Sequence, residues 1–168
     1  MKNMIKFFMV ITIIMLFTGC TNQPIMQSAK ILIPDSMYDE GYIYEITTDG
    51  TIKVSSGNIL SWDDENNYNL EYKTKQLSIL QRKKVNELIT KVKENKEPIK
   101  EEPAIEDSIT VLALIDGVQY CSRFSSLEEK ELYNHDIDQN VVNLAVKLIK
   151  ISPFKAKGLT TVIKIEGM

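Results

Sequence analysis

The sequence predicts an α+β domain in which an antiparallel sheet is built from two β-hairpins and two main helices pack on one face. Two observations predict the sheet: apolar residues alternate with polar ones around an Asp-Gly pair near residue 50, and they do so again around one near residue 117. A third predicts the helices, because at two places apolar residues recur at helical spacing behind a capping residue. The chain has 168 residues, 43% of them hydrophobic and 26% charged, which is typical of a globular protein and sufficient for one core.

The first hairpin is expected to turn at Gly50. A three-residue loop over 48–50 pairs Ile46 with Ile52, so that apolar residues face apolar residues across the strands. A two-residue loop would instead pair Ile46 with Lys53. The longer loop is therefore predicted, with Gly50 in the left-handed conformation.

The second hairpin covers 108–124 and is expected to turn at 116–117, an Asp-Gly pair. This register pairs Leu112 with Cys121, which predicts a buried, unreactive thiol. The first arm is apolar on both faces, as expected of a central strand.

Four weaker patterns complete the outline. Residues 68–76 alternate and carry lysines, which predicts a strand at an edge of the sheet. Residues 127–133 are expected to form a short helix behind a capping box, and 159–165 a last strand. Residues 95–107 are charged and contain prolines, which predicts a connection that does not pack.

Both main helices have start signals. Ser78 followed by Gln81 is a capping box that opens a helix over 79–94, and Asp138 caps a helix that Pro153 ends. The apolar residues expected in the buried stripe of the first helix are Leu80, Val85, Leu88, Ile89 and Val92. Its polar residues expected to face water are Arg82, Lys83, Lys84, Asn86, Glu87 and Lys91. The stripe of the second helix is Val141, Val142, Ala145, Leu148 and Ile149.

The N-terminus carries Lys2 and Lys6 ahead of an uncharged run at 7–17. This run is shorter than the roughly 20 apolar residues of a membrane span and fits the hydrophobic region of an export signal. The Thr-Gly pair before Cys20 resembles the lipobox of bacterial lipoproteins, although Phe17 stands where that family prefers leucine. The resemblance covers about 20 residues. It implies that a diacylglyceryl group, with palmitate-like chains, is attached to Cys20 and that cleavage makes Cys20 the first residue.

This reading divides the chain into a signal peptide (1–19), a lipidated cysteine with a tether (20–39) and a single small domain (40–168). The tether is inferred from two prolines and the lack of sustained periodicity, with a short extended stretch at 30–33. Removal of 1–19 takes away two of 20 basic residues and none of 23 acidic ones, which changes the net charge from -3 to -5. Such a charge opposes binding to nucleic acid and to anionic lipid.

No complete catalytic or metal-binding constellation is found in the sequence. A nucleophilic triad would have to join the single histidine, His135, to Ser125 or Cys121, and the Gly-x-Ser-x-Gly elbow is absent. We interpret His135 as a solvated or capping residue. With 2 Cys and 1 His, the chain cannot assemble a cysteine and histidine zinc site. The sequence therefore predicts no catalytic residue, no metal ligand and no cofactor.

Alternating oxygen ligands at Asp136, Asp138 and Asn140 match the opening of an EF-hand loop. The match fails because Val141 and Lys147 stand where that loop needs glycine and glutamate. The cap role of Asp138 explains the spacing without calcium.

Three aromatic residues are candidate ligand-binding or partner-binding residues: Trp62, Tyr68 and Tyr72. Core packing is the other interpretation of Trp62. The oxygen-rich run at 63–67 is interpreted as a solvated turn, and a cation site is its other interpretation.

The combination favours a lipid-anchored extracytoplasmic binding or protein-interaction module without catalytic activity, held on the outer face of the cell membrane. Its expected partner is an envelope protein, a peptide or a cell-wall ligand, and not nucleic acid. The alternative is a surface-located hydrolase that uses His135 with a nearby acid. That alternative requires His135 to line a pocket with a nucleophile about 3 Å away.

Overall fold

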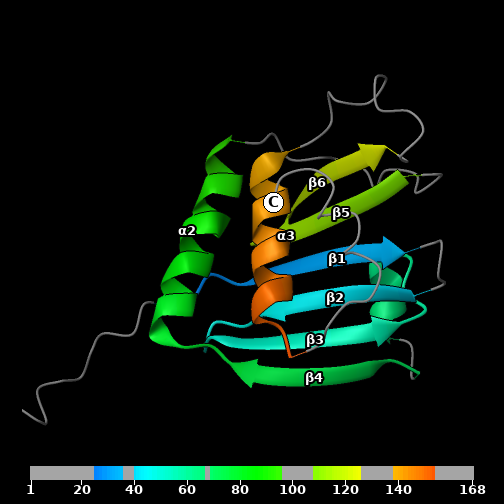
Figure 1. Ribbon diagram of the computed structural model, residues 1–168, viewed down its shortest axis with the longest axis horizontal. Helices are drawn as coiled ribbons and strands as arrows, with labels where there is room; N and C mark the ends of the chain where they lie inside the picture. Colours follow the sequence, from blue (N-terminus) through cyan, green and yellow to red (C-terminus); the bar gives the residue numbers. More distant parts are fainter. Residues whose placement is uncertain (1–24, 36–39, 67–68, 96–107, 126–137, 154–168) are drawn as a thin grey trace, which may run out of the picture.

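The computed structural model describes residues 25–35, 40–66, 69–95, 108–125 and 138–153 and arranges them as a sheet with helices on one face (Figure 1). The strands form one antiparallel sheet in the order β4-β3-β2-β1-β5-β6. Their bounds are β1 (Ala29–Asp35), β2 (Glu40–Ile46), β3 (Thr51–Gly57), β4 (Glu71–Gln76), β5 (Ser108–Ile115) and β6 (Val118–Ser125). The helices are the 3-10 helix η1 (Trp62–Asn66), α2 (Ile79–Asn95) and α3 (Gln139–Ile151). The predicted α+β fold is confirmed.

Strand β1 lies in the middle of the sheet, between β2 and β5. Its residues Ile31, Leu32 and Ile33 are fully buried, and Met26 ahead of it is 1% exposed. The prediction of a tether is therefore wrong for 25–35, which belong to the domain. The extended stretch expected at 30–33 is the middle of this strand. The full strand is not evident from the sequence because both of its faces are apolar, which removes the alternation that marks a strand with one face in water.

The first hairpin has the predicted register. Ile46 pairs with Ile52, the Gly50 N–H donates to the Thr47 carbonyl at 2.9 Å, and Gly50 has a φ of +81°. This register confirms the three-residue loop. The φ value confirms the left-handed backbone at Gly50, which residues with a Cβ rarely adopt.

The second hairpin also has its predicted register, with Leu112 opposite Cys121. Asp116 and Gly117 have φ values of +51° and +79°, as a two-residue type I′ turn requires. Cys121 is buried, as expected from its position in the sheet.

Both helix caps are confirmed. In α2 the Ser78 N–H donates to Gln81 Oε1 at 2.9 Å, and the Gln81 N–H donates to Ser78 Oγ at 3.3 Å. In α3 the Asp138 carboxylate accepts from the Asn140 and Val141 N–H groups. The α3 residues buried in the core are Val141, Val142, Leu144, Ala145, Leu148 and Ile151, whereas Ile149 is only partly buried.

Two side chains of α2 lie on the opposite side from the one predicted. Leu80 is 77% exposed, and Arg82 is only 8% exposed. Helical spacing explains both corrections, because Arg82 shares a face with the buried Val85 and Ile89, whereas Leu80 shares a face with the exposed Lys84. Position along the helix, and not the apolar character of Leu80, therefore decides whether its side chain is buried.

The sheet is apolar on both faces but is covered differently on each. The main core lies between the sheet and the two helices. On the opposite side, which we call the outer face, a smaller cluster is covered by the segment that contains η1 (Figure 1). Its buried members are Leu32, Ile43, Ile59, Leu112 and Cys121. Ile59 approaches closely over Gly41, where a Cβ would meet the Ile59 carbonyl oxygen at 2.0 Å.

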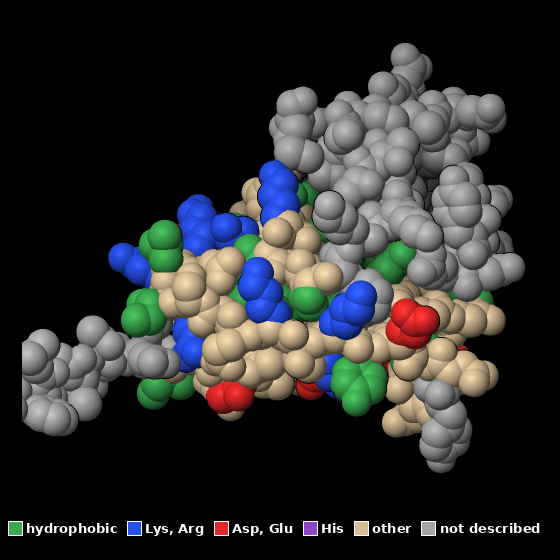
Figure 2. Space-filling view, turned by 60° about the horizontal axis from the view of Figure 1, so that its bottom comes forward, with side chains coloured by type: hydrophobic (Ala, Val, Ile, Leu, Met, Phe, Trp, Pro, Cys, Tyr) green, Lys and Arg blue, Asp and Glu red, His purple; other side chains and the backbone are tan. Residues whose placement is uncertain are grey.

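Charge is unevenly distributed among the described residues. Helix α2 carries five Lys or Arg residues and two Glu, whereas η1 carries three acidic residues and no basic one. The two elements lie toward opposite ends of the strands in Figure 1. Figure 2, which brings the β4 edge forward, shows many more Lys and Arg than Asp and Glu side chains on that side.

Several predictions fall outside the described residues. They concern the signal at 7–17, Cys20, the short helix at 127–133 with His135, the connection at 96–107 and the tail strand at 159–165. Among the described helices, none combines the length and the apolar composition needed to cross a bilayer.

Candidate functional site

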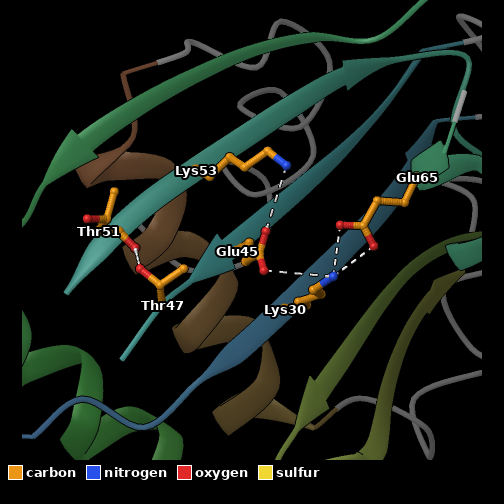
Figure 3. Close-up of polar contacts among 6 residues, drawn as sticks. All are labelled: Lys30, Glu45, Thr47, Thr51, Lys53 and Glu65. Carbon is orange, nitrogen blue, oxygen red and sulfur yellow. Dashed lines mark hydrogen bonds and ion pairs between the residues drawn. The ribbon is translucent and has the colours of Figure 1, made fainter. Parts of the chain in front are cut away.

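A row of charged side chains crosses the outer face of the sheet (Figure 3). Lys53 on β3 pairs with Glu45 on β2, and Glu45 pairs with Lys30 on β1, so the three side chains stand in line. Lys30 Nζ lies 3.8 Å from Glu45 Oε1, and Lys53 Nζ lies 4.0 Å from Glu45 Oε2. The central carboxylate is thus held between two ammonium groups.

Glu65 of η1 extends this row at its β1 end. Lys30 Nζ donates to both Glu65 carboxylate oxygens at 2.8 Å, and Figure 3 shows the two side chains pointing toward one another. We call Lys53, Glu45, Lys30 and Glu65 the charged row. It contains two positive and two negative groups, so it is electrically balanced within itself.

The acidic run of η1 has structural partners. The Asp64 carboxylate accepts from the Leu60 and Ser61 N–H groups at 2.9 Å each, and these hydrogen bonds lower the pKa of Asp64. Asp64 therefore fixes the start of η1, while Glu65 fixes η1 to the sheet. Within the described residues, no group of three or more His, Cys, Asp or Glu side chains is placed to hold a metal ion.

Trp62 packs against the apolar cluster of the outer face. Its side chain is partly buried, and its Nε1 is buried without a hydrogen-bond partner in the described part of the chain. Packing on this cluster accounts for most of the indole. Only its remaining exposed part is available to a ligand.

Tyr72 is presented to solvent. It lies on the edge strand β4, whose side chains are all exposed, and is itself 68% exposed. Lys53 Nζ lies 5.9 Å from the centre of its ring, which is within the range of a cation–π contact. Tyr72 thus continues the charged row toward the edge of the sheet.

The three predicted binding residues therefore differ in position. Trp62 and Tyr72 both belong to the outer face, Trp62 over its apolar cluster and Tyr72 at its edge, and Tyr68 lies outside the described residues. The charged row was not predicted as a site. Glu45 faces Lys53 in the register of the first hairpin, but Lys30 joins them only because β1 is part of the sheet.

A shallow open depression lies elsewhere, on the solvent side of α2. It is lined by Lys83, Asn86, Glu87, Thr90, Lys91 and Glu94. All six residues belong to one helix, so the depression is a groove between helix side chains and has no second wall.

Comparisons with known proteins give no relative. No family model matches the sequence, and neither a curated protein nor a solved structure matches the chain.

Proposed function

We propose that this protein is a lipid-anchored extracytoplasmic protein-interaction module without catalytic activity. Acyl chains on Cys20 hold it on the extracytoplasmic side of the cell membrane. The outer face of the sheet binds an envelope protein. The lipobox-like sequence supports the first part, because the diacylglyceryl group that it implies on Cys20 carries the two acyl chains that stable membrane anchoring needs.

The exposed pair of Tyr72 and Lys53 is the observation that carries the second part. A tyrosine ring offers a large and rigid contact area with a polar end, which is why tyrosines dominate many binding hot spots. Here the ring is held on a strand and lies beside an ammonium group, so little conformational entropy is lost on binding.

The charged row indicates the class of partner. A polyanion such as an acidic wall polymer or a nucleic acid needs a surface of one sign, whereas this row alternates in sign and is balanced. A folded protein surface can match such a pattern group by group. We therefore favour an envelope protein over a cell-wall polymer.

Metabolic labelling tests the anchor. Cells that express the full chain are fed radioactive palmitate, and the wild type is compared with Cys20→Ser. Label on the wild type alone supports the proposal, whereas equal label on both proteins refutes lipidation at Cys20.

Site-specific cross-linking tests the interaction. A photoreactive amino acid at position 72 of the full chain should give one defined adduct with an envelope protein, and Lys53→Glu should remove it. The matched control is the same amino acid at position 80, which is similarly exposed but lies on α2. The same protein adduct from both positions, or no effect of Lys53→Glu, would contradict the assignment of the outer face.

A further inference from the structure

We infer that the solvent side of α2 lies against an anionic phospholipid surface, namely the bilayer that holds the anchor. This inference rests on the proposed lipidation of Cys20. It adds an orientation, because it states which side of the domain touches the membrane and which side is left for a partner.

The first argument is the short distance between the anchor and the domain. The Gln27 N–H donates to Asn86 Oδ1 at 3.1 Å, and Asn86 Nδ2 donates to the Ile25 carbonyl at 2.9 Å. Gln27 Nε2 also donates to Thr90 Oγ1 at 3.2 Å. The first described residues are therefore fastened to the side of α2.

Chain length then limits how far α2 can be from the lipid. Ile25 is five residues beyond Cys20. Five residues span at most about 18 Å even when fully extended. Since β1 begins where a longer tether was expected, the domain cannot stand away from the bilayer, and the side that carries Ile25 must stay near it.

The second argument is the chemistry of that side. Three exposed apolar residues lie on α2 or beside it: Ile25, bonded to Asn86, is 87% exposed, Leu80 77% and Ile79 49%. Lys83 and Lys84 follow Leu80 at helical spacing on the exposed face of α2. Apolar side chains flanked by lysines are typical of surfaces that lie in the membrane interface, where the lysine stems remain in the apolar layer and the ammonium groups reach the phosphates.

The third argument is the charge distribution. The net charge of -5 expected after cleavage would repel an anionic bilayer if it were evenly spread. The solvent side of α2 carries four exposed lysines and two exposed glutamates, since the fifth basic residue, Arg82, is buried, whereas η1, toward the other end of the strands, is wholly acidic in charge. An anionic surface therefore attracts α2 and repels η1.

Existing ion pairs do not prevent this contact. Lys84 pairs with Glu87 and Lys93 pairs with Asp116, but the two lysine side chains are still 52% and 40% exposed. Exposed pairs of this kind contribute little to stability, so these lysines can exchange a carboxylate for a lipid phosphate at small cost.

The test uses the full lipidated chain in vesicles of phosphatidylethanolamine and phosphatidylglycerol whose acyl chains carry bromine, a short-range quencher of tryptophan. The single native tryptophan is first replaced, Trp62→Phe, and Leu80→Trp or Tyr72→Trp is then introduced. We expect the emission of the position-80 tryptophan to fall about twofold relative to unbrominated vesicles, because an interfacial side chain reaches the acyl boundary. The emission of the position-72 tryptophan should not change.

Two further arms separate the possible failures. Lys83→Glu with Lys84→Glu should abolish the quenching at position 80, as should vesicles of brominated phosphatidylcholine alone, whereas flotation with the vesicles should persist because it depends on the anchor. A chain that does not float refutes the anchor and the inference together. A chain that floats with equal quenching at positions 80 and 72 refutes only the orientation.

A second measurement avoids the change at Trp62. Nitroxide labels on Leu80→Cys and Tyr72→Cys report membrane depth through their accessibility to oxygen and to a nickel chelate. A membrane-depth signal at position 80 alone supports the inference, and the same depth at both positions overturns it.

Discussion

Lys30 Nζ donates to both carboxylate oxygens of Glu65 and thereby joins the central strand of the sheet to η1. Both side chains are less than one-third exposed, at 29% and 25%, so solvent screens this pair less than an open surface pair. The contact holds the segment that covers the apolar cluster of the outer face.

We expect a measurable coupling between these two residues. A double-mutant cycle with Lys30→Met and Glu65→Gln, followed by urea unfolding, should give a coupling free energy of about 1 kcal/mol. The matched control is the more exposed pair Lys84 and Glu87 on α2, which should give no more than about 0.5 kcal/mol. Equal couplings for the two pairs would show that η1 is not fixed by this contact.

Gly50 and Arg82 are expected to be coupled for a steric reason. Gly50 has a φ of +81°, and a Cβ there would lie 2.4 Å from Arg82 Nε, which itself donates to the Leu77 carbonyl at 3.0 Å. Gly50→Ala should therefore destabilise the protein by backbone strain of about 1 to 2 kcal/mol and by a clash in addition.

The variant Arg82→Ala separates the two costs. In that background Gly50→Ala should retain the strain but lose the clash, so its effect on the free energy of unfolding should be smaller than in the wild type. An undiminished effect would mean that the guanidinium moves aside freely and that its packing over the turn is unimportant.

Tyr44 carries a buried hydroxyl without a hydrogen-bond partner among the described residues. Tyr44→Phe removes this unsatisfied group while keeping the ring, so we expect an increase in stability of about 1 kcal/mol. Thermal unfolding at neutral pH measures it. Tyr42→Phe, on the neighbouring ring that stacks at 6.4 Å, is the control and should not stabilise the protein. A loss of stability in Tyr44→Phe would contradict the assignment.

The same residue predicts a dependence on alkaline pH. Burial, with a smaller contribution from Tyr42, raises the pKa of Tyr44 well above its ordinary value of about 10. The folded chain then keeps a proton that the unfolded chain has already lost, so stability is unaffected below about pH 10 and falls as the pH rises further. Tyr44→Phe should make this fall shallower, and an unchanged slope would rule out Tyr44 as its source.

Short sequence patterns were sufficient to predict the fold where turn residues and the pairing of side chains across strands agree. The registers of both hairpins followed from matching apolar residues across an Asp-Gly turn, and both main helices followed from caps such as that of Asp138. The predictions for Arg82 and Leu80 are wrong because position on the helix, and not residue type, decides which of its side chains are buried.

The candidate site was less predictable because it depends on a long-range partner. Tyr72 and Trp62 could be chosen as aromatic residues near an acidic run, but nothing local distinguishes the exposed ring from the packed one. Lys30 meets Glu45 only after β1 has been placed beside β2, which no short-range pattern requires. The charged row is thus a consequence of sheet topology.

The central position of β1 gives the last prediction, which concerns where the folding unit begins. Residues 25–35 supply the strand that joins β2 to β5, and Ile31 and Ile33 are fully buried in the main core. A soluble fragment that starts at residue 36 would lose this strand and leave two unpaired strand edges inside the sheet. It should therefore show no cooperative thermal transition by circular dichroism. A fragment that starts at residue 21 lacks Cys20, the proposed site of acylation, but keeps the strand, and it should unfold cooperatively. If the shorter fragment melted at the same temperature as the longer one, β1 would be dispensable, and the limit that we infer for the distance between the domain and the proposed anchor would no longer hold.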